Sequence, residues 1–225
     1  MQATAHSRGG EARRELLDVA IDCFARFGYQ ATSIDRIARE AGVTKGALYY
    51  HFKDKADLLF AAVKSRVGQW ERRVVGEVRP VPSATARLQQ VAQVCLDHAT
   101  KSNHRRMIIT LMVEALDTNA PLSAEFRAMM RRFREFLASL IASGQRHGEF
   151  RADVDPAVAA EVYAGAVMGA EIQYYQDPEA ISLPATLDGF VDQYVSWLSV
   201  GVNHHRSNDS RTRARSGPAR RATRS

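Results

Sequence analysis

Apolar positions recur every three or four residues along most of this chain, a spacing typical of amphipathic helices. The first apolar stripe ends at Gly28, placed where a glycine closes a helix. Its members are Leu17, Ala20, Ile21, Phe24 and Phe27. The sequence contains none of the alternating β-branched runs that indicate strands, so the pattern predicts an all-α protein.

The next segment, TSIDRIAREAG, predicts a second and shorter helix that ends at Gly42. Thr32 and Ser33 are alternative N-caps, and Thr32 with Asp35 fits a capping box. The inner face of this helix is formed by Ile34, Ile37, Ala38 and Ala41. The terminal glycine permits a tight turn into the segment that follows.

A third, very short helix is predicted to begin at Val43 or Thr44 and to end near Phe52. We expect Val43 and Leu48 to bury its inner side against the preceding helix. Two short helices joined through a glycine make a helix-turn-helix, in which the second helix enters the major groove of DNA.

Residues 54–78 predict a long fourth helix, which Asp54 caps and which carries Asp57 in its first turn. Pro80 and Pro82 end it. Four or five amphipathic segments follow, which gives about nine helices in all. These segments are ATARLQQVAQVCLDHATKS, HRRMIITLMVEALDTN, PLSAEFRAMMRRFREFLASLIASGQRHGEF, DPAVAAEVYAGAVMGAEIQYYQD and LPATLDGFVDQYVSWLSV.

The composition is that of an ordinary globular protein, with 45% hydrophobic residues. No stretch approaches the roughly 20 apolar residues of a membrane span, and the N-terminal segment lacks the apolar core of a signal peptide. We therefore expect a cytoplasmic protein without a membrane partner. Cys23 and Cys95 lie in apolar helical patterns without a histidine at ligand spacing, so we expect reduced core residues and neither a metal nor a cofactor.

The formal net charge of +6 is concentrated at the C-terminus. Residues 204–225 contain seven Arg and one Asp, whereas residues 1–203 hold 24 basic and 24 acidic side chains. Such a segment, rich in Arg, Ser and Thr, buries too little apolar surface to fold, so we expect a disordered basic tail. It contributes either non-specific attraction to phosphates or only solubility.

The polar face of the third helix carries side chains suited to DNA. Leu48 and Phe52 are predicted to point inward, and the outward positions are then Lys45, Gly46 and Tyr49. Glycine costs roughly 1 kcal/mol relative to alanine inside a helix, but it removes a side chain at the closest approach to a duplex. Lysine can reach guanine acceptors, and tyrosine hydroxyls suit phosphate contacts. A solvated polar face explains any one of these residues equally well.

The stretch TSIDRIAREAGVTKGALYYHFKDKADLL resembles the DNA-binding signature of the TetR/AcrR family of bacterial transcriptional regulators. The resemblance covers about residues 12–60; the other helices resemble the family in number, length and order. It implies an N-terminal three-helix DNA-binding domain and a C-terminal helical domain for ligand binding and dimerisation. We divide the chain into a flexible arm (1–10), a helix-turn-helix domain (11–53), a ligand-binding and dimerisation domain (54–203, with a linking helix over 54–78) and the basic tail (204–225).

By position, the resemblance implies two groups of DNA contacts. Those on the base or groove side are Thr44, Lys45, Gly46 and Tyr49, and those on the phosphate side are Ser33, Tyr50, His51 and Lys55. Residues 1–60 hold nine Lys or Arg against eight Asp or Glu. We therefore expect affinity to rest on a few placed contacts and on the two DNA-binding heads of a dimer.

The resemblance also implies that the last two helices pair with those of a second copy as a four-helix bundle. Small residues on the first helix and bulky ones on the second fit such an interface, although an intramolecular core explains them too. The predicted interface residues are Ala164, Gly165, Gly169, Phe190, Tyr194 and Trp197.

Flexible and aromatic side chains between residues 54 and 176 suit an apolar cavity for a small molecule, although each of them also fits an ordinary core. The candidate pocket residues are Trp70, Met107, Met112, Glu114, Met129, Met130, Phe133, Tyr163, Met168, Glu171 and Tyr174. The two glutamates either meet a cationic ligand, face solvent or pair with Arg105, Arg106 or Arg131.

We therefore expect a ligand-responsive repressor, bound to double-stranded operator DNA as a homodimer and released from a palindromic operator by an apolar or amphipathic effector. An activator and an effector-independent or architectural DNA-binding factor are the alternatives. An α-helical enzyme would need convergent catalytic groups. The sequence shows no nucleophile elbow, no paired carboxylates on one helical face, no metal spacing and no glycine-rich phosphate loop, so we assign no catalytic residue.

Overall fold

The structure, a computed structural model, describes the backbone of residues 2–200 and the side chains of residues 10–200 except 103, 117 and 118. Within these residues the protein is all-α, as predicted, with nine helices and no strand. Over the same part of the chain, none of the helices combines the length and hydropathy of a membrane span. The predicted disordered tail, residues 204–225, lies outside the described residues.

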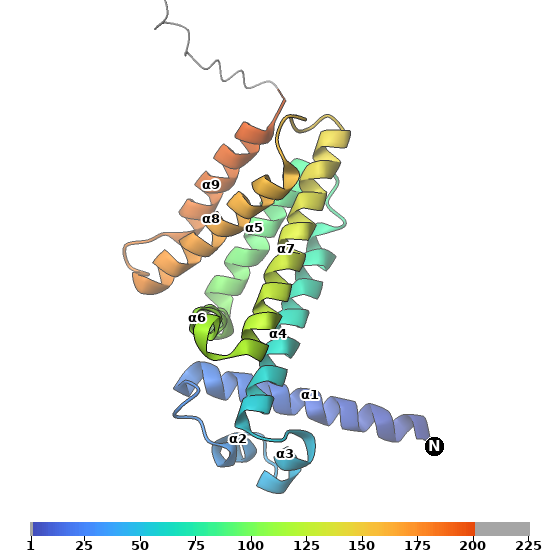
Figure 1. The fold of residues 1–225 in the computed structure, drawn as a ribbon, viewed down its shortest axis with the longest axis vertical. Coiled ribbons are helices and arrows are strands. Elements are labelled where there is room, and N and C mark those ends of the chain that lie inside the picture. The colour runs from blue at the N-terminus through green and yellow to red at the C-terminus, as the bar shows by residue number, and fades with distance from the viewer. Residues whose placement is uncertain (1, 201–225) are drawn as a thin grey trace, which may run out of the picture.

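The helices form two parts (Figure 1). We call α1–α3 the head; they are α1 (Gln2–Phe27), α2 (Ile34–Glu40) and α3 (Lys45–His51). Helix α4 (Lys55–Val78) leads from the head into the second part, the body, and runs alongside its other long helices. The rest of the body consists of α5 (Ala84–Lys101), α6 (Asn103–Thr118), α7 (Ala120–Arg146), α8 (Pro156–Gln176) and α9 (Leu183–Leu198).

Helix α1 is longer than predicted. Its backbone is helical from Gln2, so residues 2–10, which the sequence analysis assigned to an arm over residues 1–10, belong to this helix. The physical reason is that no proline precedes Gly9, and adding a residue to an existing helix costs far less than nucleating a new one. The helix therefore continues across the pair of glycines.

The start of α2 decides between the two N-caps that the sequence allowed. Ser33 is the N-cap, and its Oγ accepts a hydrogen bond from the backbone N–H of Arg36 at 3.1 Å. The capping box predicted for Thr32 and Asp35 is therefore wrong. Thr32 is buried instead, and its hydroxyl donates to the carbonyl oxygen of Gly28 at 2.7 Å, which closes the turn after α1.

Helix α4 begins as predicted and connects the two parts. The Asp54 carboxylate accepts from the backbone N–H of Asp57 at 2.8 Å, which fixes the first turn. Buried side chains then recur along the whole helix, from Leu58 to Val78, and belong to one hydrophobic cluster that includes residues of the head and of the body. The hydrophobic core is therefore continuous from the head along α4 into the body.

Candidate DNA-binding face and effector site

The turn between α2 and α3 has a geometry that requires glycine. Gly42 has a φ of +66°, a left-handed conformation that is strained for other residues. Its N–H donates to the Arg39 carbonyl at 3.2 Å, and the next N–H, that of Val43, donates to the Ala38 carbonyl at 2.9 Å. These two bonds form a Schellman motif, which satisfies the last carbonyls of α2 and sets the direction of α3.

The inner faces of the two short helices are buried through Ile37, Ala38 and Leu48. Val43 was predicted to join them, but it is 36% exposed, so this prediction is wrong. The reason is that Val43 belongs to the turn, where its backbone is held by the bond to Ala38, and not to the helix that follows. Three buried side chains are enough to fix α3 against α2 in the head.

The N-terminus of α3 is held by Thr44 and Lys45. The Thr44 hydroxyl oxygen accepts from the backbone N–H of Ala47 at 3.2 Å, as an N-cap does. The Lys45 ammonium lies 3.1 Å from the Asp35 carboxylate of α2, which raises the pKa of this lysine. Both side chains of the pair are more than half exposed, so the ion pair is weak and can give way to another partner.

The outward edge of α3 is open. Among the described residues, a methyl group added at Gly46 would meet only the Thr44 hydroxyl oxygen, at 3.7 Å. Tyr49 is 49% exposed and Tyr50 is 85% exposed, while His51 is half-buried with its ring edge against that of Tyr50. The structure therefore brings a glycine gap and two aromatic hydroxyls together on one exposed edge, as the sequence predicted.

Two predicted phosphate contacts have roles inside the head. Ser33 caps α2, and the Lys55 ammonium donates to the carbonyl oxygens of Tyr29 at 2.9 Å and Thr32 at 3.0 Å. The ammonium also lies 4.2 Å from the centre of the Tyr29 ring. An ammonium has three donors, so these two bonds use most of its capacity. Lys55 therefore fastens the start of α4 to the turn after α1.

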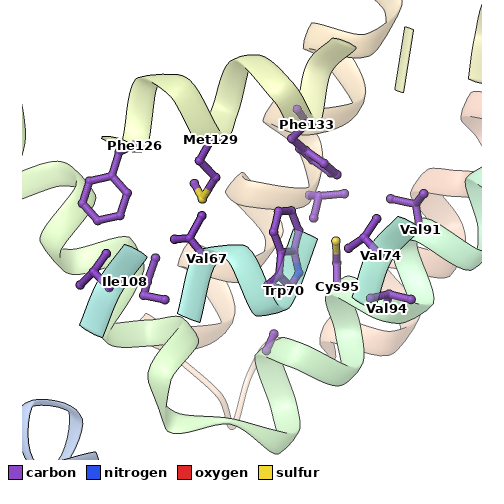
Figure 2. Close-up of a cluster of buried hydrophobic side chains, with 14 of the residues drawn as sticks. Val67, Trp70, Val74, Val91, Val94, Cys95, Ile108, Phe126, Met129 and Phe133 are labelled. Atoms are coloured by element: carbon purple, nitrogen blue, oxygen red, sulfur yellow. The ribbon is translucent and has the colours of Figure 1, made fainter. Parts of the chain in front are cut away.

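Several predicted effector residues form packed core in the body. Figure 2 shows Met129 and Phe133 of α7 above the ring of Trp70 from α4, with Cys95 of α5 close to its lower end. The ring centres of Trp70 and Phe133 are 5.2 Å apart. All four side chains are at most 8% exposed. These four side chains are therefore part of the packed core of the body.

Glu171 is fully buried and paired rather than free for a cationic ligand. Arg105, itself 8% exposed, donates to Glu171 Oε2 from Nε at 3.1 Å and from Nη2 at 2.6 Å. Burial raises the pKa of the Glu171 carboxyl, and the positive charge of Arg105 opposes that rise. Of the alternatives that the sequence left open, pairing with Arg105 is confirmed.

The other candidate pocket residues are dispersed. Tyr163 is buried, and its hydroxyl donates to the Leu88 carbonyl at 2.6 Å, so it joins α8 to α5. Glu114 and Met107 line a groove of about 810 Å³ between the end of α1 and α6. Half-buried positions are occupied by Met112, Met130, Met168 and Tyr174.

The sequence did not predict this groove between head and body. Its walls also include Tyr29 from the turn after α1 and Arg106 and Thr110 from α6. Residues far apart in the chain meet there, and no local spacing relates them. Trp70 and Phe133 instead line a smaller depression of about 190 Å³ between α4 and α7.

The predicted dimer residues fall into two groups. Ala164 and Tyr194 are buried within one chain, and the Tyr194 hydroxyl donates to the Ala159 carbonyl at 2.6 Å. Burial within one chain leaves these two residues little surface for an interface, and the Tyr194 hydroxyl joins α9 to α8. Gly165 and Trp197 are exposed. Gly169 and Phe190 are half-buried.

Two further residues extend the exposed side of α8. Val158 and Val162 are 56% and 51% exposed, and with Gly165 they follow one another at helical spacing. This apolar stripe was missed, although the recurrence of apolar and small residues every three to four positions was a signal that could have revealed it.

No cluster of three or more His, Cys, Asp or Glu side chains suited to a metal ion occurs in the described part of the chain. Cys23 and Cys95 are both buried and free of disulfides. Burial raises the pKa of the Cys95 thiol to about 12, so this thiol is protonated at neutral pH.

Two protein-family models match this chain. Residues 16–62 match the model described as bacterial regulatory proteins, tetR family, and residues 84–183 match the one described as tetracyclin repressor-like, C-terminal domain. Together the two matches cover well over half of the chain. The fatty acid metabolism regulator protein of Bacillus subtilis (strain 168) is 24% identical over 186 residues, which are 82% of this chain and 94% of that relative.

Solved structures share the fold. The transcriptional regulator FadR from Bacillus subtilis in complex with stearoyl-CoA has a TM-score of 0.70 at 21% identity, over 82% of this chain and 98% of that one. AibR in complex with isovaleryl coenzyme A and operator DNA has a TM-score of 0.62 at 25% identity, over 81% of this chain and 97% of that one.

Proposed function

This chain belongs to the tetR family of bacterial regulatory proteins, and from that premise we propose that it is a repressor that an apolar or amphipathic effector releases from a palindromic operator. The observation that carries the proposal is the outward edge of α3. Gly46 leaves a gap there that the fold does not need, and Tyr49 and Tyr50 stand exposed beside it.

In the proposed complex α3 lies in the major groove. Thr44, Gly46 and Tyr49 face the bases, and Lys45 leaves Asp35 to reach them. Tyr50 and His51 contact phosphates, which set the register of the head on the duplex. Further phosphate bonds come from the Ser33 hydroxyl and from the remaining donor of Lys55. A DNA-binding regulator acts where the chromosome is, so we place the protein in the cytoplasm.

We also propose that the repressor is a homodimer, because a palindromic operator has two-fold symmetry. The exposed stripe of α8, with Gly165 and Gly169, and the exposed Trp197 of α9 support an interface on this side of the body. Light scattering at micromolar concentration should give the mass of two chains. A monomeric mass would exclude the dimer.

An effector changes DNA affinity only if it binds one spacing of the two heads more tightly than the other. The relatives bound to stearoyl-CoA and isovaleryl coenzyme A make acyl-CoA thioesters the first class to test. The continuous core along α4 supports a route by which binding in the body moves the head.

A mobility-shift assay with the DNA that flanks its own gene tests the proposal. We expect a discrete complex at low salt that survives competition by a scrambled duplex of equal length and composition. Absence of any such complex at low salt would contradict the proposed function. A thermal-shift screen then separates an effector-controlled repressor from an effector-independent DNA-binding factor, because a true effector raises the unfolding midpoint and dissociates the complex.

A further inference from the structure

Two buried hydrogen-bond donors on α4 lack an acceptor. Among the described residues, no acceptor lies within bonding distance of Nε1 of Trp70 or Nε of Arg66, and both atoms are shielded from solvent. The two residues are four positions apart, so their side chains lie one above the other on the same side of the helix. Buried donors without a partner are rare in proteins and disfavour the state that contains them.

Charged side chains of both signs and a buried histidine surround these donors. The ring of His98 on α5 lies 6.4 Å from that of Trp70, centre to centre, and the Arg105 guanidinium lies 5.8 Å from the Trp70 ring. Burial, and to a lesser extent the nearby charges of Arg105, Arg66 and Arg73, lower the pKa of His98 to about 3. His98 is therefore neutral. Because Arg105 is paired with Glu171 and Arg66 lies near Asp18, the expected preference for an oxygen ligand rests on the two N–H donors, from which an ammonium group cannot accept.

We propose that Arg66 and Trp70 form the polar end of the effector site and bind a carboxylate or thioester carbonyl oxygen at the end of an apolar chain. The inference rests on the proposed function, because it names the chemical class of the effector. An oxygen placed between the two side chains accepts from both donors and removes the penalty that each carries in the ligand-free protein. A free acid and a coenzyme A thioester share this oxygen.

The apolar part of such a ligand would lie first in a depression beside Trp70. The depression of about 190 Å³ between α4 and α7 is lined by Trp70, Val74, Phe133 and Phe136, with charged side chains at its rim. Arg66 does not line this depression, and Nε1 of Trp70 is shielded from solvent and lies at the end of the ring away from Phe133 (Figure 2). An oxygen therefore reaches the two donors only when the packing around Trp70 opens.

Arg66 also contacts the head, together with Gln69. Arg66 Nη2 lies 3.7 Å from the Asp18 carboxylate of α1, and Gln69 Nε2 lies 3.5 Å from the same oxygen. A ligand oxygen on Arg66 Nε draws the guanidinium toward the body and weakens its attraction to Asp18. The proposed site thus sits at a contact through which α4 holds α1.

The test uses the full-length protein and three matched series of probes. These are straight-chain carboxylates from butanoate to palmitate, the corresponding acyl-CoA thioesters and the corresponding alkylamines, titrated by calorimetry. The acids or the thioesters should bind at least about tenfold more tightly than the amine of equal chain length, as expected for hydrogen bonds to charged groups. Preference for the acids identifies a free carboxylate, and preference for the thioesters identifies a carbonyl.

Trp70→Phe removes the N–H and keeps an aromatic ring. We expect it to lower the affinity for the preferred oxygen ligand by about tenfold and to change the affinity for the matching amine far less. Phe133→Leu is the matched control, because it shortens the apolar wall without touching a donor and should weaken all probes by the same factor. Arg66→Lys removes Nε and keeps the charge, and it should reproduce the selective loss.

The inference is overturned if no probe binds, if amines bind as tightly as the oxygen ligands, or if Trp70→Phe weakens all probes equally. Operator binding by the unliganded wild-type protein is measured in parallel. A protein that binds its operator but fails these tests contradicts the inference alone, whereas a protein that does not bind the operator contradicts the proposed function.

Discussion

Two helical glycines show what distinguishes the head from the body. A methyl group added at Gly46 of α3 would meet a single described atom, at 3.7 Å. A methyl group added at Gly144 of α7 would lie 2.2 Å from the Phe150 ring and 2.9 Å from Ala84 Cβ. The packing of the protein itself requires Gly144. No described residue crowds Gly46, so packing within the chain does not require a glycine there.

The ion pairs of the head and of the body differ in exposure. In the head, Lys45 and Asp35 form an ion pair with both partners exposed and able to separate. In the body, Arg105 and Glu171 are both buried, and each depends on the other for its hydrogen bonds. The charged side chains of this pair in the head are available to another partner, whereas those of the buried pair in the body are already engaged.

The largest effect is expected from Arg105→Met in the body. The substitution leaves Glu171 buried without its partner, and breaking such a pair costs about 3–5 kcal/mol of unfolding free energy. Urea titration at neutral pH measures this loss. Replacing both partners, as Arg105→Met with Glu171→Leu, should recover most of it, because no charge is then left unpaired in the core.

Arg73→Met is the control for that experiment. It breaks the pair of Arg73 with Glu77, in which both side chains are about two-fifths exposed, and the longer contact of Arg73 with Asp97 at 3.4 Å. The expected loss is below about 1 kcal/mol. Equal losses for the two single variants would show that the buried pair contributes no more than a surface one.

Gly144→Ala tests the packing of the body. The new methyl group forces the buried Phe150 ring aside, and we expect a loss of about 3 kcal/mol, at the upper end for overpacking. Helix propensity alone favours alanine by roughly 1 kcal/mol. A fall in the unfolding free energy would therefore show that crowding outweighs propensity, and a rise would show the opposite. Gly76→Ala, in α4 with open space around it, is the matched control and should be neutral or stabilising. A stable Gly144→Ala protein would contradict the crowded geometry.

Gly46→Leu tests the head. We expect operator affinity to fall at least about 100-fold, equivalent to about 2.7 kcal/mol, because the side chain occupies the approach of the duplex. The unfolding free energy should stay close to that of the wild type. Gly76→Leu, another open helical glycine, should leave operator affinity unchanged in the same mobility-shift assay. Operator binding retained by Gly46→Leu would show that the glycine is incidental.

The smallest effect concerns pH. The folded protein lowers the pKa of His98 from 6.5 to about 3, so the unfolded chain binds this proton more readily. The contribution of neutral His98 to the unfolding free energy is fully present above pH 6.5 and is lost as the pH falls toward 3. Between pH 7.5 and 5 the loss is about 2 kcal/mol, and His98→Gln should remove that part of the slope. An unchanged slope in urea titrations at the two pH values would contradict the buried neutral histidine.

Local spacing predicted most of the fold because helices and caps depend on residues three or four positions apart. Examples are the N-cap of α4 at Asp54 and helix α3, which lies between Thr44 and Phe52. Predictions failed where the conformation of a side chain depends on a partner that is far away in the sequence. The Thr32 hydroxyl bonds to a carbonyl nine residues away, and the Lys55 ammonium bonds to one 26 residues away.

The body was harder to predict for the same reason. Glu171 meets Arg105 across 66 residues, and nothing local selects this arginine over its neighbours. Ala164 and Tyr194 have the size and polarity of interface residues, but the packing of α8 on α9 buries them within one chain. The unpaired donors of Arg66 and Trp70 have no signature in the sequence, because a missing partner is a property of the assembled core.

The placement of the two tryptophans gives the protein an intrinsic pair of optical reporters. Trp70 is buried beside the proposed ligand oxygen, whereas Trp197 is exposed on α9, on the proposed dimer side. Indole emission shifts to longer wavelength as the ring becomes more exposed to water, so the two residues should emit in separable bands. Ligand entry would alter the shorter-wavelength band, and association of two chains would alter the longer-wavelength one. Both events can then be followed in one sample without any added dye.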